Sequence, residues 1–188
     1  MKRLNSLFSI TLATLITAGT ISTSWAGSDK QELAVVKSII DKSGMTAKQV
    51  LQKVQQEYNG VIYSYELDDE KDVYFHEIKL IDIEADKKIK LTISIHNGEV
   101  VKKDLSRLFS WFGDDKHIVT ARKLATMKYS ILDAIDSIDL NKSTLLKEVD
   151  LEDKQGILFF ELETVGESGE TDWLVDVNNN QLIPVFTK

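Results

Sequence analysis

Three histidines, His76, His96 and His117, are the side chains of this chain best suited to acid–base chemistry or metal binding near neutral pH. The sequence contains no Cys, which excludes disulfides, thiol catalysis and Cys-ligated zinc. It also contains no H-E-x-x-H motif, no Gly-rich phosphate loop and no G-x-S-x-G motif. We therefore predict no catalytic residue, no cofactor-binding residue and no metal ligand, and hence a protein that is not an enzyme.

A weak metal site is the one alternative that the histidines leave open. His76 and His96 fall in or next to neighbouring predicted strands, so a cross-strand pair is conceivable. A self-alignment of the chain, described below, places Phe160 at the position of His76 and Asn178 at that of His96. A position that accepts Phe favours packing, so we interpret His76 as a packing residue.

Two acidic runs are the other candidate ion ligands. One comprises Glu66, Asp68, Asp69, Glu70 and Asp72, and the other comprises Asp150, Glu152 and Asp153. Carboxylates of this kind would suit calcium. Both runs fall in predicted turns between strands, where a run of like charges is usually a solvated surface, and we prefer that interpretation.

An apolar cluster formed by Leu108, Phe109, Trp111 and Phe112 is the densest outside the predicted repeats. Buried aromatic side chains dominate protein–protein interfaces, so the cluster is a candidate partner-binding site. Aromatic residues in a connector also commonly cover a core, and a plug between two units is the preferred interpretation.

The first 26 residues have the three-part pattern of a secretory signal peptide. Lys2 and Arg3 precede the apolar run Leu7–Ile21, and Ser24-Trp25-Ala26 is an A-x-A-like cleavage site, which predicts cleavage between Ala26 and Gly27. A membrane span needs about 20 strongly apolar residues, whereas this run is shorter and rich in Thr. We expect an exported protein, located in the periplasm or alternatively secreted, with no membrane span after signal removal.

The charge of the chain argues against nucleic acid as a partner. The formal net charge is -7, and the predicted signal carries two cations and no acid, so the mature part is more acidic still. An acidic surface repels phosphate backbones.

The remainder of the chain repeats itself. With a shift of 84 residues, Thr46–Leu51 aligns with Ser130–Ile135, and Val73–Ile78 aligns with Ile157–Leu162. With a shift of 82, Leu91–Ile95 aligns with Trp173–Val177. The two-residue difference falls in charged or Gly-rich stretches that are typical of hairpin loops.

Each copy has the pattern of a helix followed by three strands. Thr46 with Gln49, and Ser130 with Asp133, form capping boxes ahead of apolar residues at helical spacing. In the last strand of the first copy, Ile89–Ile95 alternates between apolar and polar residues, which indicates a sheet with one buried face.

The predicted fold is therefore α+β, with two tandem repeats that each pack a helix on a small antiparallel three-stranded sheet. We assign 1–26 to the signal, 27–103 to the first unit, 104–128 to a connector and 129–188 to the second unit. An additional amphipathic helix is predicted at Ser28–Lys42, and a further helix is predicted within the connector at Asp114–Leu124. The sequence leaves open whether the units share one sheet and whether the protein oligomerises.

The end of each copy resembles the PepSY domain, whose last strand carries the pattern V-D-x-x-x-G-x-V. The matching segments are Ile93–Val100 and Val175–Leu182. The first copy departs from the pattern at Ser94, in place of Asp, and the second at Asn180, in place of Gly. Asn also adopts the left-handed conformation, so that exchange is tolerable. The resemblance covers about 46–101 and 130–184, and the tandem arrangement is also similar to β-lactamase-inhibitor-type proteins.

The resemblance implies a function through the kinds of protein in which the domain occurs, and not through particular site residues. PepSY domains occur in propeptides of secreted metalloproteases and in small exported proteins, and the family has no common catalytic residues to carry over. It implies a non-enzymatic cell-envelope binding or regulatory protein that restrains a peptidase. Its partner would be another envelope or secreted protein. The alternative is a periplasmic sensor of a small ligand or metal ion, and a hydrolase with an unrecognised site ranks last.

Overall fold

A computed structural model describes residues 29–71, 73–108, 116–138, 140, 144–167 and 169–183. The first unit comprises α1 (Asp29–Lys42), α2 (Ala47–Glu57), β1 (Val61–Glu70), β2 (Val73–Asp82), β3 (Lys87–Ser94) and β4 (Val100–Arg107). The second comprises α3 (Lys116–Ala125), α4 (Ile131–Asp136), β5 (Leu145–Lys154), β6 (Ile157–Gly166), β7 (Gly169–Asp176) and β8 (Gln181–Ile183). The predicted α+β class is confirmed.

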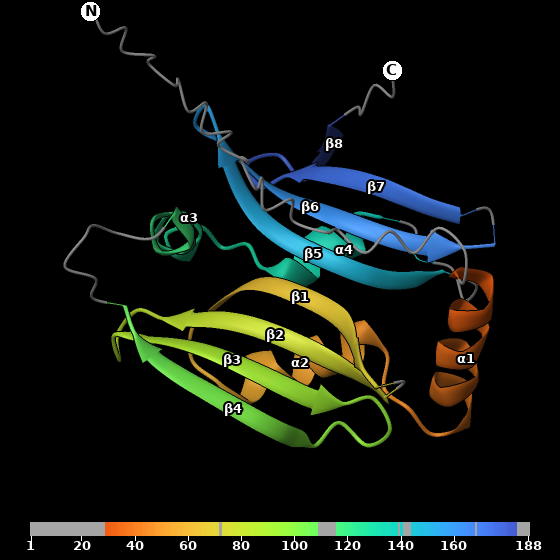
Figure 1. Cartoon of the computed structure of the whole chain (residues 1–188). Coiled ribbons are helices and arrows are strands. Elements are labelled where there is room, and N and C mark those ends of the chain that lie inside the picture. The colour runs from red at the N-terminus through yellow and green to blue at the C-terminus, as the bar shows by residue number, and fades with distance from the viewer. Residues whose placement is uncertain are drawn as a thin grey trace, which may run out of the picture.

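All eight described strands belong to one antiparallel sheet, in the order β4-β3-β2-β1-β5-β6-β7-β8 (Figure 1). The two units meet where β1 pairs with β5, and we call this junction the seam. The prediction of three strands per unit was short by one, because β4 and β8 each add a strand at an outer edge.

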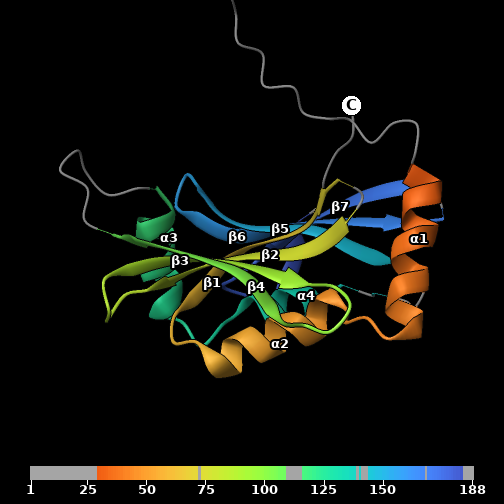
Figure 2. The same ribbon diagram turned by 60° about the horizontal axis from the view of Figure 1, so that its bottom comes forward.

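Helices α2 and α4 cover the same face of the sheet (Figure 2). Val50, Leu51 and Val54 of α2 are buried, and α4 buries its apolar residues in the same way. The Thr46 side chain accepts a hydrogen bond from the Gln49 N–H, and the Gln49 side chain accepts one from the Thr46 N–H (2.8 Å). These bonds satisfy N–H groups that the first turn of a helix leaves unpaired.

A local two-fold relation connects the units at the seam. Tyr65 pairs with Val149, and these two residues are themselves equivalent under the 84-residue shift. The first strand of each unit also has an irregularity at the same place, beside Ile62 in β1 and beside Leu146 in β5. The seam therefore resembles the interface of a symmetric dimer, built within one chain.

Backbone conformations repeat as well. Lys71 and Gln155, 84 residues apart, both have positive φ in the β1–β2 and β5–β6 turns. Gly98 (φ 67°) and Asn180 (φ 55°) occupy equivalent left-handed positions, as expected from the exchange of Gly for Asn.

The structure extends the repeat to the helices that precede α2 and α4. Both α1 and α3 were predicted as helices outside the repeat, yet they occupy equivalent places in their units. Helix α3 of the second unit contacts β1 and β5. Helix α1 of the first unit lines a cleft of about 470 Å³ together with Leu145 and Leu146 of β5. Each leading helix therefore lies at the seam, at opposite ends (Figure 1).

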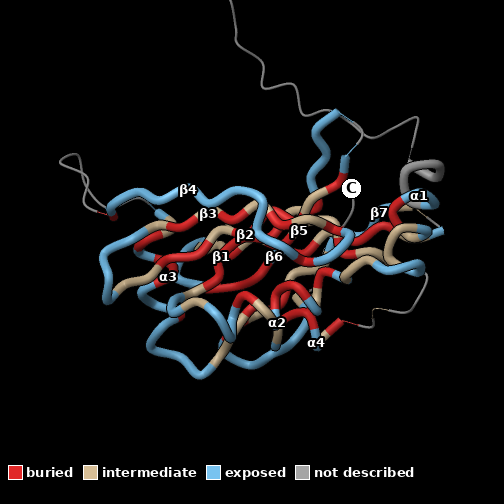
Figure 3. Tube along the Cα trace, turned by 90° about the horizontal axis from the view of Figure 1, so that it is seen from below, coloured by how far each residue is buried: buried red, intermediate tan, exposed pale blue. Residues whose placement is uncertain are grey.

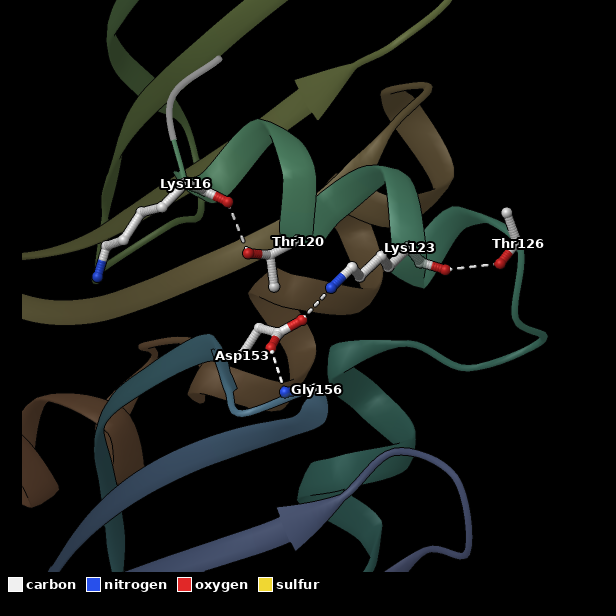
Figure 4. Close-up of polar contacts among 6 residues, drawn as sticks. All are labelled: Lys116, Thr120, Lys123, Thr126, Asp153 and Gly156. Atoms are coloured by element: carbon white, nitrogen blue, oxygen red, sulfur yellow. Dashed lines mark hydrogen bonds and ion pairs between the residues drawn. The ribbon is translucent and has the colours of Figure 1, made fainter. Parts of the chain in front are cut away.

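Ion pairs connect α3 to the end of β5. Lys123 pairs with Asp153, whose carboxylate also accepts a hydrogen bond from the Gly156 N–H (3.1 Å; Figure 4). Lys116 pairs with Glu152 (3.0 Å), and Thr120 donates to the Lys116 carbonyl (2.6 Å). Two members of the second predicted acidic run, Glu152 and Asp153, thus pair with lysines of α3, and the run lies in β5 rather than in the predicted turn.

One core runs along the helix-covered face, and exposed residues lie on the β4 edge, in turns and on the outer sides of the helices (Figure 3). Tyr65 and Ile78 of the first unit and Val149 and Leu162 of the second are almost completely buried. Leu124 of α3 belongs to the same core.

We predict that Leu124→Ala will destabilise the whole chain by about 2–5 kcal/mol, because it removes buried methyl groups and leaves a cavity. Val119→Ala, at an exposed position of the same helix, is the matched control and should change stability by less than about 0.5 kcal/mol. Urea denaturation measures both. Equal effects of the two substitutions would show that α3 does not contribute to the core.

Candidate binding surface

Strand β4 forms one outer edge of the sheet, and all eight of its residues are exposed (Figure 3). Its exposed apolar side chains include Val101 and Leu105, which are 55% and 57% exposed. Among the described strands, none pairs with its outer side. A strand edge of this kind offers backbone N–H and C=O groups to an incoming strand.

The register shows which backbone groups of β4 face outward. The Leu108 N–H donates to the Asp86 carbonyl (3.3 Å), and the β3–β4 pairing continues this register. Hydrogen-bonded pairs alternate with non-hydrogen-bonded pairs in an antiparallel ladder. The backbone groups of Lys103, Leu105 and Arg107 therefore point away from β3.

The face of the sheet opposite α2 and α4, which we call the open face, carries charged residues. Glu77 is nearly buried there and pairs with Lys90 (2.6 Å) and Lys79 (3.1 Å). Burial alone would raise the pKa of Glu77, but hydrogen bonds from the two lysines lower it overall. At the edge, Lys102 pairs with Asp104 (2.9 Å).

A groove of about 580 Å³ lies between this open face and α3. Its lining includes Tyr63, Lys79 and Lys90 from the sheet, Leu105 from the β4 edge, and His117 from α3. The His117 ring lies against that of Tyr63, with the ring centroids 5.0 Å apart. The groove places the β4 edge next to a polar surface able to contact side chains of a bound segment.

Carboxyl groups gather on the open face at the seam. Glu66 of β1 pairs in register with Glu148 of β5, and Asp150 lies two residues further along β5. Burial, followed by a hydrogen bond with Asp150 and the charges of Asp150, Glu66 and Glu163, raises the pKa of Glu148 to about 7. Glu148 therefore keeps its proton up to a higher pH than an ordinary glutamate does.

His76 is buried and has partners for both ring nitrogens. Its Nε2 lies 3.0 Å from the Met45 carbonyl oxygen, which can only accept, so Nε2 carries the hydrogen. Nδ1 then accepts from the Tyr65 hydroxyl (3.0 Å). Burial lowers the pKa of His76 to about 4, so the ring is neutral. Packing was the preferred sequence interpretation, and the burial of His76 confirms it.

The structure does not bring His76 and His96 together. His76 pairs with Ile93 on β3, whereas His96 is exposed in the turn that follows that strand. Within the described ranges, no group of three or more His, Asp or Glu residues is arranged to hold a metal ion.

The predicted apolar cluster is only partly visible. Leu108 is buried, with 4% of its surface exposed, so it serves the core rather than a partner. Phe109, Trp111 and Phe112 lie outside the described residues, as do Ala26 and Gly27 at the predicted signal cleavage site.

Sequence reasoning missed β4, the element that forms this edge. A strand exposed at every position has no alternation of buried and exposed residues, so the periodicity that identified β3 was absent. The Asn97-Gly98 turn was the available signal, because a hairpin turn requires a strand on its far side.

Comparison with known proteins supports the PepSY resemblance of the first unit. The family model PepSY, described as the peptidase propeptide and YPEB domain, matches residues 44–104, so this segment is a PepSY domain and the resemblance is confirmed there. No curated protein matches the chain. Among solved structures, the chain is similar to a "putative lipoprotein" from Clostridium difficile 630, with 13% identity, a TM-score of 0.44, and coverage of 77% of this chain and 95% of the other. Among the residues described, no helix has the length and apolar character needed to cross a membrane.

Acid should destabilise the chain through His76. In the folded state its pKa is about 4, below the value of 6.5 for an unperturbed His, so only the unfolded state takes up a proton between these pH values. Stability from this residue is complete above pH 6.5 and falls by up to about 3 kcal/mol as pH drops towards 4. The double variant Tyr65→Phe/His76→Phe should lose this dependence in urea denaturation, whereas His96→Asn should retain it.

The contribution of Glu148 to stability should depend on pH in the opposite sense to that of His76. Because its folded-state pKa of about 7 lies above the ordinary value of 4.5, its contribution is present below pH 4.5 and is lost as pH rises through 7. Glu148→Gln should therefore be more stable relative to the wild type at pH 8 than at pH 4.5. The same difference at both pH values would contradict the assignment of the raised pKa to Glu148.

Proposed function

We propose that this protein is a non-enzymatic binding protein of the bacterial cell envelope that restrains a peptidase. The single observation that carries the proposal is the exposed β4 edge, which belongs to the unit matched by the PepSY family. The family description includes peptidase propeptides, which supports a peptidase as the partner.

The mode of binding that we propose is addition of a strand. An extended segment of the partner would hydrogen-bond to the outward backbone groups of Lys103, Leu105 and Arg107, and this is an established way for sheet edges to bind peptides. Leu105, which is largely exposed, would supply an apolar contact to the added strand.

The second unit is proposed to be a divergent PepSY-type unit. Its strand register, capping box and left-handed turn residue match those of the first unit. Its outer strand β8 has only three residues, so it offers a much shorter edge than β4 does.

The proposed location is the periplasm, with secretion as the alternative. The pattern of charged, apolar and small residues that ends at Ala26 supports export.

Leu105→Pro tests the edge directly. Proline removes the outward N–H of residue 105 without removing a hydrogen bond to β3, since edge positions with outward N–H groups tolerate Pro. Leu105→Ala is the matched control, because it shortens the same side chain and keeps the N–H group.

The processed chain and both variants would be crosslinked in envelope extract from the native host, and captured proteins identified by mass spectrometry. We expect the wild type and Leu105→Ala to capture a peptidase and to lower its activity, and Leu105→Pro to do neither. The proposal fails if no peptidase is captured, or if the Pro variant captures and inhibits one as the wild type does.

A further inference from the structure

The two outer strands of the first unit are strongly basic within an acidic protein. Together β3 and β4 carry Lys87, Lys88, Lys90, Lys102, Lys103 and Arg107. Asp104 is their single acid, whereas the whole chain has a net charge of -7. We call these six cations the basic edge.

The second unit carries acids at equivalent places. Under the shifts of 84 and 82 residues, Lys79 corresponds to Glu163, Lys88 to Glu170 and Lys90 to Asp172. The strand register agrees, since Lys79 pairs with Lys90 in the first unit and Glu163 with Asp172 in the second. One fold therefore accepts either sign of charge at these positions. The positive charge of Lys88 is thus not a requirement of the fold, whereas Lys79 and Lys90 also pair with Glu77.

The cations lie where an added strand would run. Lys102 has 65% of its side chain exposed and lies on the open face, because it pairs with Thr92. Lys103 pairs with Leu91 and lies on the other face, where its ammonium group is 4.6 Å from the centroid of the Tyr58 ring. A strand added to β4 would have its side chains beside cations on both faces.

A second copy of the chain fits this edge less well. Two β4 strands paired with each other would bring Lys102, Lys103 and Arg107 of one copy close to the same residues of the other, and like charges on paired strands are unfavourable. The acidic outer edge of a second copy is complementary in charge, but β8 offers only three residues for pairing.

We infer that the β4 edge selects an extended, acidic segment of its partner, with carboxylates beside the basic edge and an apolar residue next to Leu105. This inference rests on the proposed function, since it names the chemistry of the segment that the edge would bind. Opposite charge on the two surfaces would also guide a partner to the first unit and away from the acidic second unit.

The test uses two short synthetic peptides blocked at both ends, each with a central valine flanked on both sides by two adjacent charged residues, glutamate in one peptide and lysine in the other, so that charges lie on both faces of the added strand. Both would be titrated into the isotope-labelled processed chain, with amide chemical shifts as the readout. We expect saturable shifts within 100–107 for the glutamate peptide alone, weakening as salt rises from about 50 mM to about 500 mM.

Lys102→Glu/Lys103→Glu should weaken binding of the glutamate peptide about tenfold, from the loss of two attractions and the gain of two repulsions. Lys42→Glu/Lys128→Glu is the matched control. It changes the net charge equally at exposed positions outside β3 and β4, and should leave affinity within about twofold.

Several outcomes would overturn the inference. The inference fails if the two peptides bind equally well, or if no amide chemical shifts change within β4. It also fails if the two charge-reversal variants bind the glutamate peptide with equal affinity. Concentration-dependent self-association in sedimentation that the Lys102/Lys103 variant abolishes would identify a second copy as the occupant instead. If the peptidase capture depends on the N–H group of residue 105 but not on these lysines, the proposed function stands and this inference fails.

Discussion

The pairing of β1 with β5 is the interaction on which the rest of the structure depends. It is short, involving the pairs Ser64–Asp150, Tyr65–Val149 and Glu66–Glu148, yet it joins two four-stranded sheets into one. Because it uses the inner edge of each unit, it leaves β4 and β8 as the outer edges. It also brings the carboxyl groups of Glu66, Glu148 and Asp150 together, so the junction combines backbone hydrogen bonds with electrostatic repulsion. At its two ends lie α3, which contacts both β1 and β5, and α1, which lines a cleft together with β5.

Much of the fold could be predicted because its signals are local. The capping boxes at Thr46 and Ser130, the alternation in β3 and the turn at Gly98 each depend on a few neighbouring residues. The equivalence of α1 and α3 was missed because their buried positions have diverged, with Val36 in one helix and Thr120 in the other. The shared sheet could not be predicted, since nothing in the pattern of β1 or β5 distinguishes pairing within a unit from pairing between units.

The candidate binding surface was harder to predict than the fold. Strand β4 has no buried face, so it lacks the periodicity by which strands are found. The sequence pointed instead to the apolar cluster of 108–112 as a candidate partner-binding site, but its Leu108 is buried in the core. The exchange of Lys88 and Lys90 for Glu170 and Asp172 was present in the sequence alignment. The sequence alone did not show that these residues lie near opposite ends of one sheet. The strand register places them there, on β3 and β7.

The unequal outer strands have a consequence for stoichiometry. Two identical units related by a two-fold axis would present two identical edges and would bind two partners, or would polymerise by adding further sheets at both ends. Here one edge has eight residues and the other three, and the outer strands differ in charge. Because the two units are joined in one chain, their outer ends can differ in sequence, which a dimer of identical subunits does not permit. Among the described strands, the sheet therefore has one long outer edge, so a segment added there would find no equivalent place at the other end.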